Sequence, residues 1–154
     1  MMPVEKIDMV PAEGAAVPTR EQILKLQAAM VPIQCEQPEP IHRFAPGMYM
    51  RELTVPAGML IVGKTHRHDH FLMVMSGKAE VVSEFGREIV EAGHISMSKA
   101  GVKRIVLAIE DTRFITIHHN ASDSQDLEVV EAEHIVPDID ELANCQAFIE
   151  GETS

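Results

Sequence analysis

The sequence predicts an all-β sandwich or barrel with helical segments before and after it. Between Gly47 and Asn120, short runs rich in Val, Ile, Leu, Met and Phe alternate with turn signals such as "PAG", "SGK", "FGR" and "EDT". Many short apolar runs at close, regular spacing are typical of sandwiches and barrels. The length of 154 residues matches one domain that buries its own core.

Four segments follow one another along the chain. We expect a flexible N-terminus at 1–18, a short helix with a Pro-rich arm at 19–45, the β-barrel at 46–120, and an acidic helical tail at 121–154. The helix is predicted for "TREQILKLQAAM", where Thr19 and Gln22 have the spacing of a capping box and Ile23, Leu26 and Met30 share a face. The prolines that follow favour an extended arm over a helix.

The tail changes to helical spacing. In "SDSQDLEVVEAEHI", one face carries Leu127, Val130 and either His134 or Ile135, and Ser122 or Ser124 is expected to cap the helix. A second short helix is predicted for "DIDELANCQAFIEG".

Charge and composition exclude several functions. The net charge is −11, and residues 121–154 carry ten acids with no Lys or Arg, whereas nucleic-acid binding needs a basic footprint. No apolar run approaches the roughly 20 residues of a membrane span, and the N-terminus lacks the apolar region of a signal peptide. Cys35 and Cys145 are therefore expected as free thiols in a cytoplasmic protein.

Three histidines lie at alternate positions in "GKTHRHDHFLMVMSG". On an extended strand His66, His68 and His70 share one face, and imidazoles arranged in this way bind Zn, Fe, Mn or Ni. The alternative is a strand at a barrel mouth that is rich in histidine without binding a metal.

The surrounding stretch, "PAGMLIVGKTHRHDHFLMVMSGKAEV", resembles the first cupin motif, with Gly58 and Gly77 at its two glycine positions. The resemblance implies a cupin-type β-barrel or jelly roll, and it places metal-ligand positions at Lys64, His66 and His70. "KAGVKR" is similar to the second motif, with Arg104 where a histidine is usual. A standard site of three His and one Glu is therefore absent, and we expect an altered one.

Residues 40–135 look more narrowly like small cupin-like proteins encoded by tailed bacteriophages and some bacteria. The features that carry this resemblance are the pair His66 and His70, the "EDT" turn at 110–112, the strand that ends in His118, and the acidic helix. The resemblance implies a fold and a genomic setting and names no substrate, because most members have no assigned activity. Together with the altered ligand set and the Pro-rich arm, it suggests a virion or assembly protein.

His118 is the candidate third ligand. Alternation along the last strand puts it with Phe114 and Thr116, and strands on opposite sides of a small closed barrel approach within side-chain reach. Alternatively, His118 and His119 end the strand and bind water or backbone. His68 is expected at the rim, and the remaining histidines carry no spacing signal and are expected as surface or satisfied groups: His42, His94 and His134.

Arg51, Lys64 and Arg104 allow two interpretations. They can form an anion pocket beside the imidazoles for a carboxylate or phosphate. We favour the other interpretation, in which Lys64 and Arg104 point outward and pair with acids such as Glu80 or Glu91.

Three functions remain, in order of preference. The first is a non-enzymatic, phage-type virion or assembly component, in the host cytoplasm or the virion, that forms a homo-oligomer through the barrel and the N-terminal arm and contacts other virion proteins. The second is a small enzyme with a divalent transition metal at His66, His70 and His118. The third is a module that binds an anionic small molecule. Neither nucleic acid nor membrane is expected as a partner.

Overall fold

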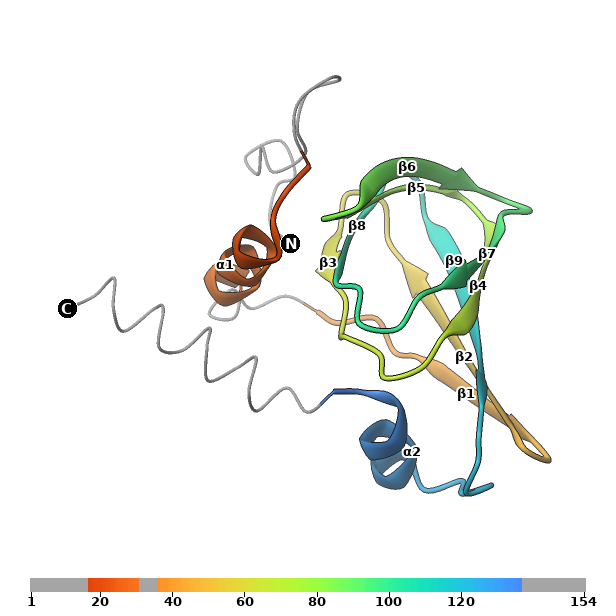
Figure 1. The fold of residues 1–154 in the computed structure, drawn as a ribbon. Helices are drawn as coiled ribbons and strands as arrows, with labels where there is room; N and C mark the ends of the chain where they lie inside the picture. The colour runs from red at the N-terminus through yellow and green to blue at the C-terminus, as the bar shows by residue number, and fades with distance from the viewer. Residues whose placement is uncertain (1–16, 31–35, 137–154) are drawn as a thin grey trace.

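A computed structural model describes residues 17–30 and 36–136, with the strands in two antiparallel sheets that face each other (Figure 1). The five-stranded sheet has the order β1-β2-β9-β4-β7, and the four-stranded sheet has the order β3-β8-β5-β6. The strands are β1 (Ile41–Ala45), β2 (Met48–Val55), β3 (Leu60–Val62), β4 (His70–Ser76), β5 (Lys78–Ser83), β6 (Gly86–Glu91), β7 (Ile95–Ser98), β8 (Arg104–Ala108) and β9 (Thr112–His119). The all-β fold class is confirmed, although the described strands form two separate sheets and not one closed barrel.

The main core lies between the two sheets. Alternate residues of each strand point inward, so the apolar members of each run meet those of the facing sheet. Both sheets contribute to the buried cluster, which consists of Val55, Met59, Val74, Ala79, Val81, Val90, Ala108 and Phe114. The same alternation fixes which polar side chains of these strands face the interior.

Gly77 connects β4 to β5 in a conformation that requires glycine. Its φ is +88°, and a Cβ atom at this position would lie 2.1 Å from the carbonyl oxygen of Asp111. The neighbouring Lys78 N–H donates to Thr112 Oγ1, and that hydroxyl lies 3.0 Å from the carbonyl oxygen of Lys78. The "SGK" and "EDT" turns therefore pack directly on each other.

Helix α1 (Arg20–Met30) covers the outer face of the four-stranded sheet. Ile23 and Leu26 are buried against Val82 of β5 and Ile105 of β8. At its start, Gln22 N donates to Thr19 Oγ1 and Thr19 N donates to Gln22 Oε1, which is the capping box that the sequence indicated.

Strand β1 is an edge strand of the five-stranded sheet. It begins at Ile41, whereas the sequence analysis placed the first barrel residue at position 46. Ile41–Ala45 pairs antiparallel with β2 across a turn at Pro46 and Gly47, whose φ is +70°. Prolines flank this segment, but none interrupts it, and an edge strand tolerates prolines at its ends.

Helix α2 (Leu127–His134) follows β9. Its N-cap is Asp126, whose carboxylate accepts a hydrogen bond from Glu128 N, so the predicted serine cap is wrong. The hydroxyl of Ser124 instead accepts a hydrogen bond from the backbone N–H of Asp126, the N-cap residue itself. Val130 and His134 form the buried face of the helix.

Some predictions fall on residues that the structure does not describe. Cys35, Cys145, the second predicted helix of the tail and most of the N-terminal segment lie outside the described ranges. Within those ranges, no helix has the length and apolar character needed to cross a membrane.

Candidate metal centre

Three histidines converge inside one end of the sandwich. His66 comes from the loop between β3 and β4, His70 is the first residue of β4, and His118 lies near the end of β9. One ring nitrogen from each histidine lies within 4.8 Å of those of the other two. The ring centroids are 4.3 Å apart for His66 and His70, and 4.5 Å apart for His70 and His118.

The register of β4 and β9 explains why His70 and His118 meet. Phe71 pairs with Ile117 and Leu72 pairs with Thr116, so His70 and His118 follow on neighbouring strands and point to the same inner face. The predicted convergence of His66, His70 and His118 is what the structure shows, and it needs no closed barrel.

Hydrogen bonds hold two of the three rings. His70 Nδ1 lies 3.3 Å from the carbonyl oxygen of His68, so its N–H donates there and Nε2 keeps a free lone pair. His118 Nε2 lies 2.8 Å from Thr116 Oγ1. Hydrogen bonds of this kind orient imidazoles and fix their tautomer in metal sites.

All three imidazoles are held in the neutral form that binds metals. Burial, and after it the charges of His70, Arg51 and Arg104, lowers the pKa of His66 to about 3. Burial and the two neighbouring histidines of the cluster lower the pKa of His118 to about 3, and burial also lowers the pKa of His70. Near neutral pH, three neutral imidazoles therefore bring one ring nitrogen each to within 4.8 Å of the others. This donor set fits a divalent transition metal such as Zn, Fe, Mn or Ni.

His134 lies beside the cluster, and the sequence gave no sign of this position. It is buried, its ring stands edge-on to that of His118 at a centroid distance of 5.4 Å, and its two nitrogens lie 2.7 Å from the carbonyl oxygens of Val130 and His119. As the sequence analysis expected, it is a satisfied histidine. The helical spacing from Val130 was the available signal for its burial.

Tyr49 was also missed as a neighbour of the site. It pairs with His118 across β2 and β9, stacks on that ring at 5.5 Å, and its hydroxyl lies 2.6 Å from Nδ1 of His42. Strand alternation in "MYMRELTV" could have placed Tyr49 inward, but the sequence does not show which strand lies next to β2. His68 is exposed and outside the cluster, as expected for a rim residue.

The C-terminal end of α2 fastens the loop that carries His66. His66 forms an isolated β-bridge with Ile135. On either side of it, Arg67 N donates to the His134 carbonyl oxygen at 2.8 Å, and Val136 N donates to the Thr65 carbonyl oxygen at 2.9 Å. We call this pairing of residues 65–67 with 134–136 the clasp.

The three cations of the predicted anion pocket lie in different places. Lys64 is exposed and pairs with Glu131 of α2, not with Glu80 or Glu91. Arg51 and Arg104 are half-buried and point inward. The preferred interpretation of an outward Arg104 is therefore wrong.

Comparisons with known proteins show the fold. No family model matches the sequence, and no curated protein does so either. A protein with a double-stranded β-helix domain from Klebsiella pneumoniae subsp. pneumoniae MGH 78578 is 18% identical with a TM-score of 0.50, over 59% of this chain and 84% of that one. The DMSP lyase DddQ from Ruegeria pomeroyi DSS-3 is 10% identical with a TM-score of 0.50, over 57% of this chain and 49% of that one.

A Cupin 2 conserved barrel domain protein from Salinispora arenicola CNS-205 is 19% identical with a TM-score of 0.47, over 60% of this chain and 83% of that one. The neighbour from Klebsiella pneumoniae supports a double-stranded β-helix fold, the all-β architecture that the sequence predicted. The narrower resemblance to phage-encoded proteins stays a prediction.

Proposed function

We propose that this chain is a cupin-fold metalloprotein that holds a divalent transition metal at His66, His70 and His118 and acts on a small molecule there. The observation that carries the proposal is the approach of three ring nitrogens to within 4.8 Å of one another. Three imidazoles with open coordination positions are typical of catalytic metal sites.

Some residues of such a site would bind the metal, and others would orient the ligands. His66, His70 and His118 supply neutral donors, and Thr116 and the His68 carbonyl oxygen orient two of their rings. A bound divalent ion would polarise a carbonyl or phosphoryl oxygen, or lower the pKa of a water molecule.

The altered cupin motif leaves two of its four ligand positions able to bind a metal, His66 and His70, and His118 adds a third donor from outside the motif. Lys64 and Arg104 occupy the other two motif positions, and both carry a positive charge. Lys64 is paired with Glu131, and a guanidinium keeps its proton and cannot act as a donor to a metal. Remaining coordination positions are thus left for water or for a ligand.

Metal analysis of the purified full-length chain tests the proposal. We expect close to one transition-metal ion per chain in the wild type, and its loss in the double variant His66→Ala/His70→Ala. The matched control is His68→Ala, which removes an exposed histidine outside the cluster and should retain the ion. Retention of the metal by the double variant, or metal-free wild-type protein after exposure to Zn²⁺, Mn²⁺, Fe²⁺ and Ni²⁺, would contradict the proposal.

The virion or assembly role, the homo-oligomer formed through barrel and arm, and the cytoplasmic location stay predictions from the sequence. Detection of the chain in purified particles, together with its mass in solution, would test the assembly role independently of metal content.

A further inference from the structure

Arg51 points into the interior next to the histidine cluster. It lies on β2 between His42 of β1 and Thr116 of β9, its direct cross-strand partners on the same face. Thr116 in turn contacts the His118 ring.

Arg104 approaches from the opposite sheet. It is the first residue of β8 and alternates with Val106 and Ala108, both of which pack in the core between the sheets. The two arginines therefore face the space between the sheets from opposite sides, and Arg51 does so next to Thr116 and the histidine cluster.

Both guanidiniums lack a partner, judged over residues 17–30 and 36–136. Neither guanidinium makes a hydrogen bond or an ion pair with these residues, and Glu88 acts on that of Arg104 through its charge alone. Other arginines of the sheets are paired: Arg87 pairs with Glu80.

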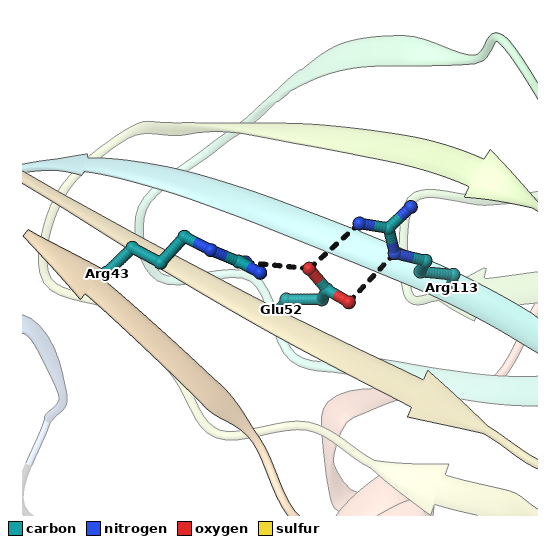
Figure 2. Close-up of polar contacts among 3 residues, drawn as sticks. All are labelled: Arg43, Glu52 and Arg113. Carbon is teal, nitrogen blue, oxygen red and sulfur yellow. Dashed lines mark hydrogen bonds and ion pairs between the residues drawn. The ribbon is translucent and has the colours of Figure 1, made fainter.

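Arg43 and Arg113 provide the clearest contrast. Both bind the carboxylate of Glu52 on the outer face of the five-stranded sheet, as Figure 2 shows. A half-buried guanidinium without such a partner loses hydration without gaining hydrogen bonds. Arg51 and Arg104 therefore differ from Arg43, Arg87 and Arg113 in having no carboxylate partner among the described residues.

The charge around the cluster is unbalanced in the described part of the chain. The donor cluster consists of three histidines and includes no carboxylate, so a divalent ion and two guanidiniums would stand together without a negative ligand. Asp69 accepts from Ala100 N and Glu131 pairs with Lys64. Glu88, the acid whose charge acts on Arg104, is exposed on β6 and makes no ion pair with that guanidinium. An anion that enters the site would supply the missing negative charge.

We infer that Arg51 and Arg104 form an anion subsite beside the metal centre, and that its ligand is a small organic dicarboxylate. One carboxylate reaches the open positions of the metal, and the other pairs with the guanidiniums, whose planar forks match carboxylate geometry. For the carboxylate at the metal, the inference rests on the proposed function. For the carboxylate at Arg51 and Arg104, it depends only on the geometry of β2 and β8.

Calorimetric titration with malonate tests the inference on the full-length, Zn²⁺-loaded chain at fixed ionic strength. We expect saturable binding that weakens about 10-fold or more in Arg51→Gln and in Arg104→Gln, as expected for loss of a charge-assisted pair. Malonamide, which has a similar shape and no charge, should not bind. The matched control is Arg43→Gln, which removes the same charge from the outer face of the sheet and should bind malonate like the wild type.

A Co²⁺-loaded sample adds a spectroscopic measurement, because a carboxylate that joins the metal changes the visible absorption of cobalt. Equal malonate affinity in the wild type and both arginine variants, or equal binding of malonamide, would overturn the inference while leaving the metal centre intact. If the chain takes up no metal, the titration on metal-free protein still tests whether Arg51 and Arg104 bind a carboxylate. Malonate binding that depends on Arg51 and Arg104 would then support the subsite, while the lack of metal uptake would by itself refute the metal centre.

Discussion

The imidazole of His134 joins the end of β9 to the end of α2, because its two ring nitrogens lie 2.7 Å from the carbonyl oxygens of His119 and Val130. The same ring stands edge-on against His118, a proposed metal ligand. Residue 134 also begins the clasp that holds the loop of His66. His134 therefore supports two of the three proposed ligands, His118 through its ring and the loop of His66 through its backbone carbonyl oxygen.

Replacing His134 should weaken metal binding without removing a ligand. In His134→Phe much of the ring volume remains, but the polar contacts of the ring with the carbonyl oxygens of Val130 and His119 are lost, and α2 should detach more readily from β9. We expect metal affinity to fall by about 10-fold, a typical result when a residue that supports a ligand is lost. Competition with a chromogenic chelator measures the affinity, and hydrogen exchange of α2 amides should increase in parallel.

The control for this prediction is His119→Ala. It removes the exposed neighbouring side chain and keeps the carbonyl oxygen that His134 contacts. Unchanged affinity in His134→Phe would mean that His118 is positioned by β9 alone.

Gly77→Ala should destabilise the fold strongly. The new methyl group would lie 2.1 Å from the Asp111 carbonyl oxygen in a backbone with φ of +88°. Strained backbone of this kind costs about 1–3 kcal/mol, and the steric clash adds to that cost. Urea denaturation should show the loss, whereas Gly86→Ala, which has open space and no positive φ, should unfold within about 1 kcal/mol of the wild type. Equal stability of the two variants would show that the two turns separate easily.

The Glu52 carboxylate should make stability depend on pH in the acid range. Hydrogen bonds from Arg113 and then from Arg43 lower the pKa of Glu52 from its usual 4.5 to about 2. Since the folded pKa is the lower one, the stabilisation is complete above about pH 4.5 and is lost as the pH falls toward 2. Glu52→Gln should thus be less stable than the wild type at pH 6, and the difference should shrink below pH 4.5.

Denaturation curves measured between pH 2 and pH 6 check this prediction. Glu36→Gln, which changes an exposed acid, serves as the control. A difference between wild type and Glu52→Gln that stays constant over the whole pH range would argue against the two ion pairs of Figure 2.

Metal binding should depend less on pH between 7 and 5 than binding to ordinary imidazoles does. In the folded chain the pKa of His66 and of His118 is lowered to about 3, and burial also lowers the pKa of His70, so fewer protons compete with the metal at pH 5. An imidazole with the ordinary pKa of about 6.5 would instead weaken metal binding by more than about 20-fold over this range. Zn²⁺ affinities measured at several pH values distinguish the two cases, and a steep decline would mean that the imidazoles are solvated in the metal-free protein.

The sequence predicted those features that depend on local spacing. The strand pattern gave the fold class, the cupin spacing singled out His66 and His70, and alternation in the last strand put His118 on the inner face. Features that depend on which strand lies beside which were not accessible. To predict which face of the sheet Arg104 lies on, the start of β8 would have to be known to within one residue. A shift of one position moves every side chain of a strand to the opposite face.

The position of His134 was beyond prediction for the same reason. Its helical pattern indicated a buried face, but nothing in "LEVVEAEH" shows that this face covers the end of β9. Likewise, β1 was assigned to the arm because prolines surround it, and its membership in the sheet became visible only through its pairing with β2.

The clasp also sets the order of events during synthesis. Residues 65–67 leave the ribosome long before residues 134–136, the partners that hold the His66 loop in place. A growing chain can therefore form most of both sheets while one of its three histidines is still unanchored. Tight metal uptake should accordingly follow release of the C-terminal segment from the ribosome, as one of the last steps in maturation.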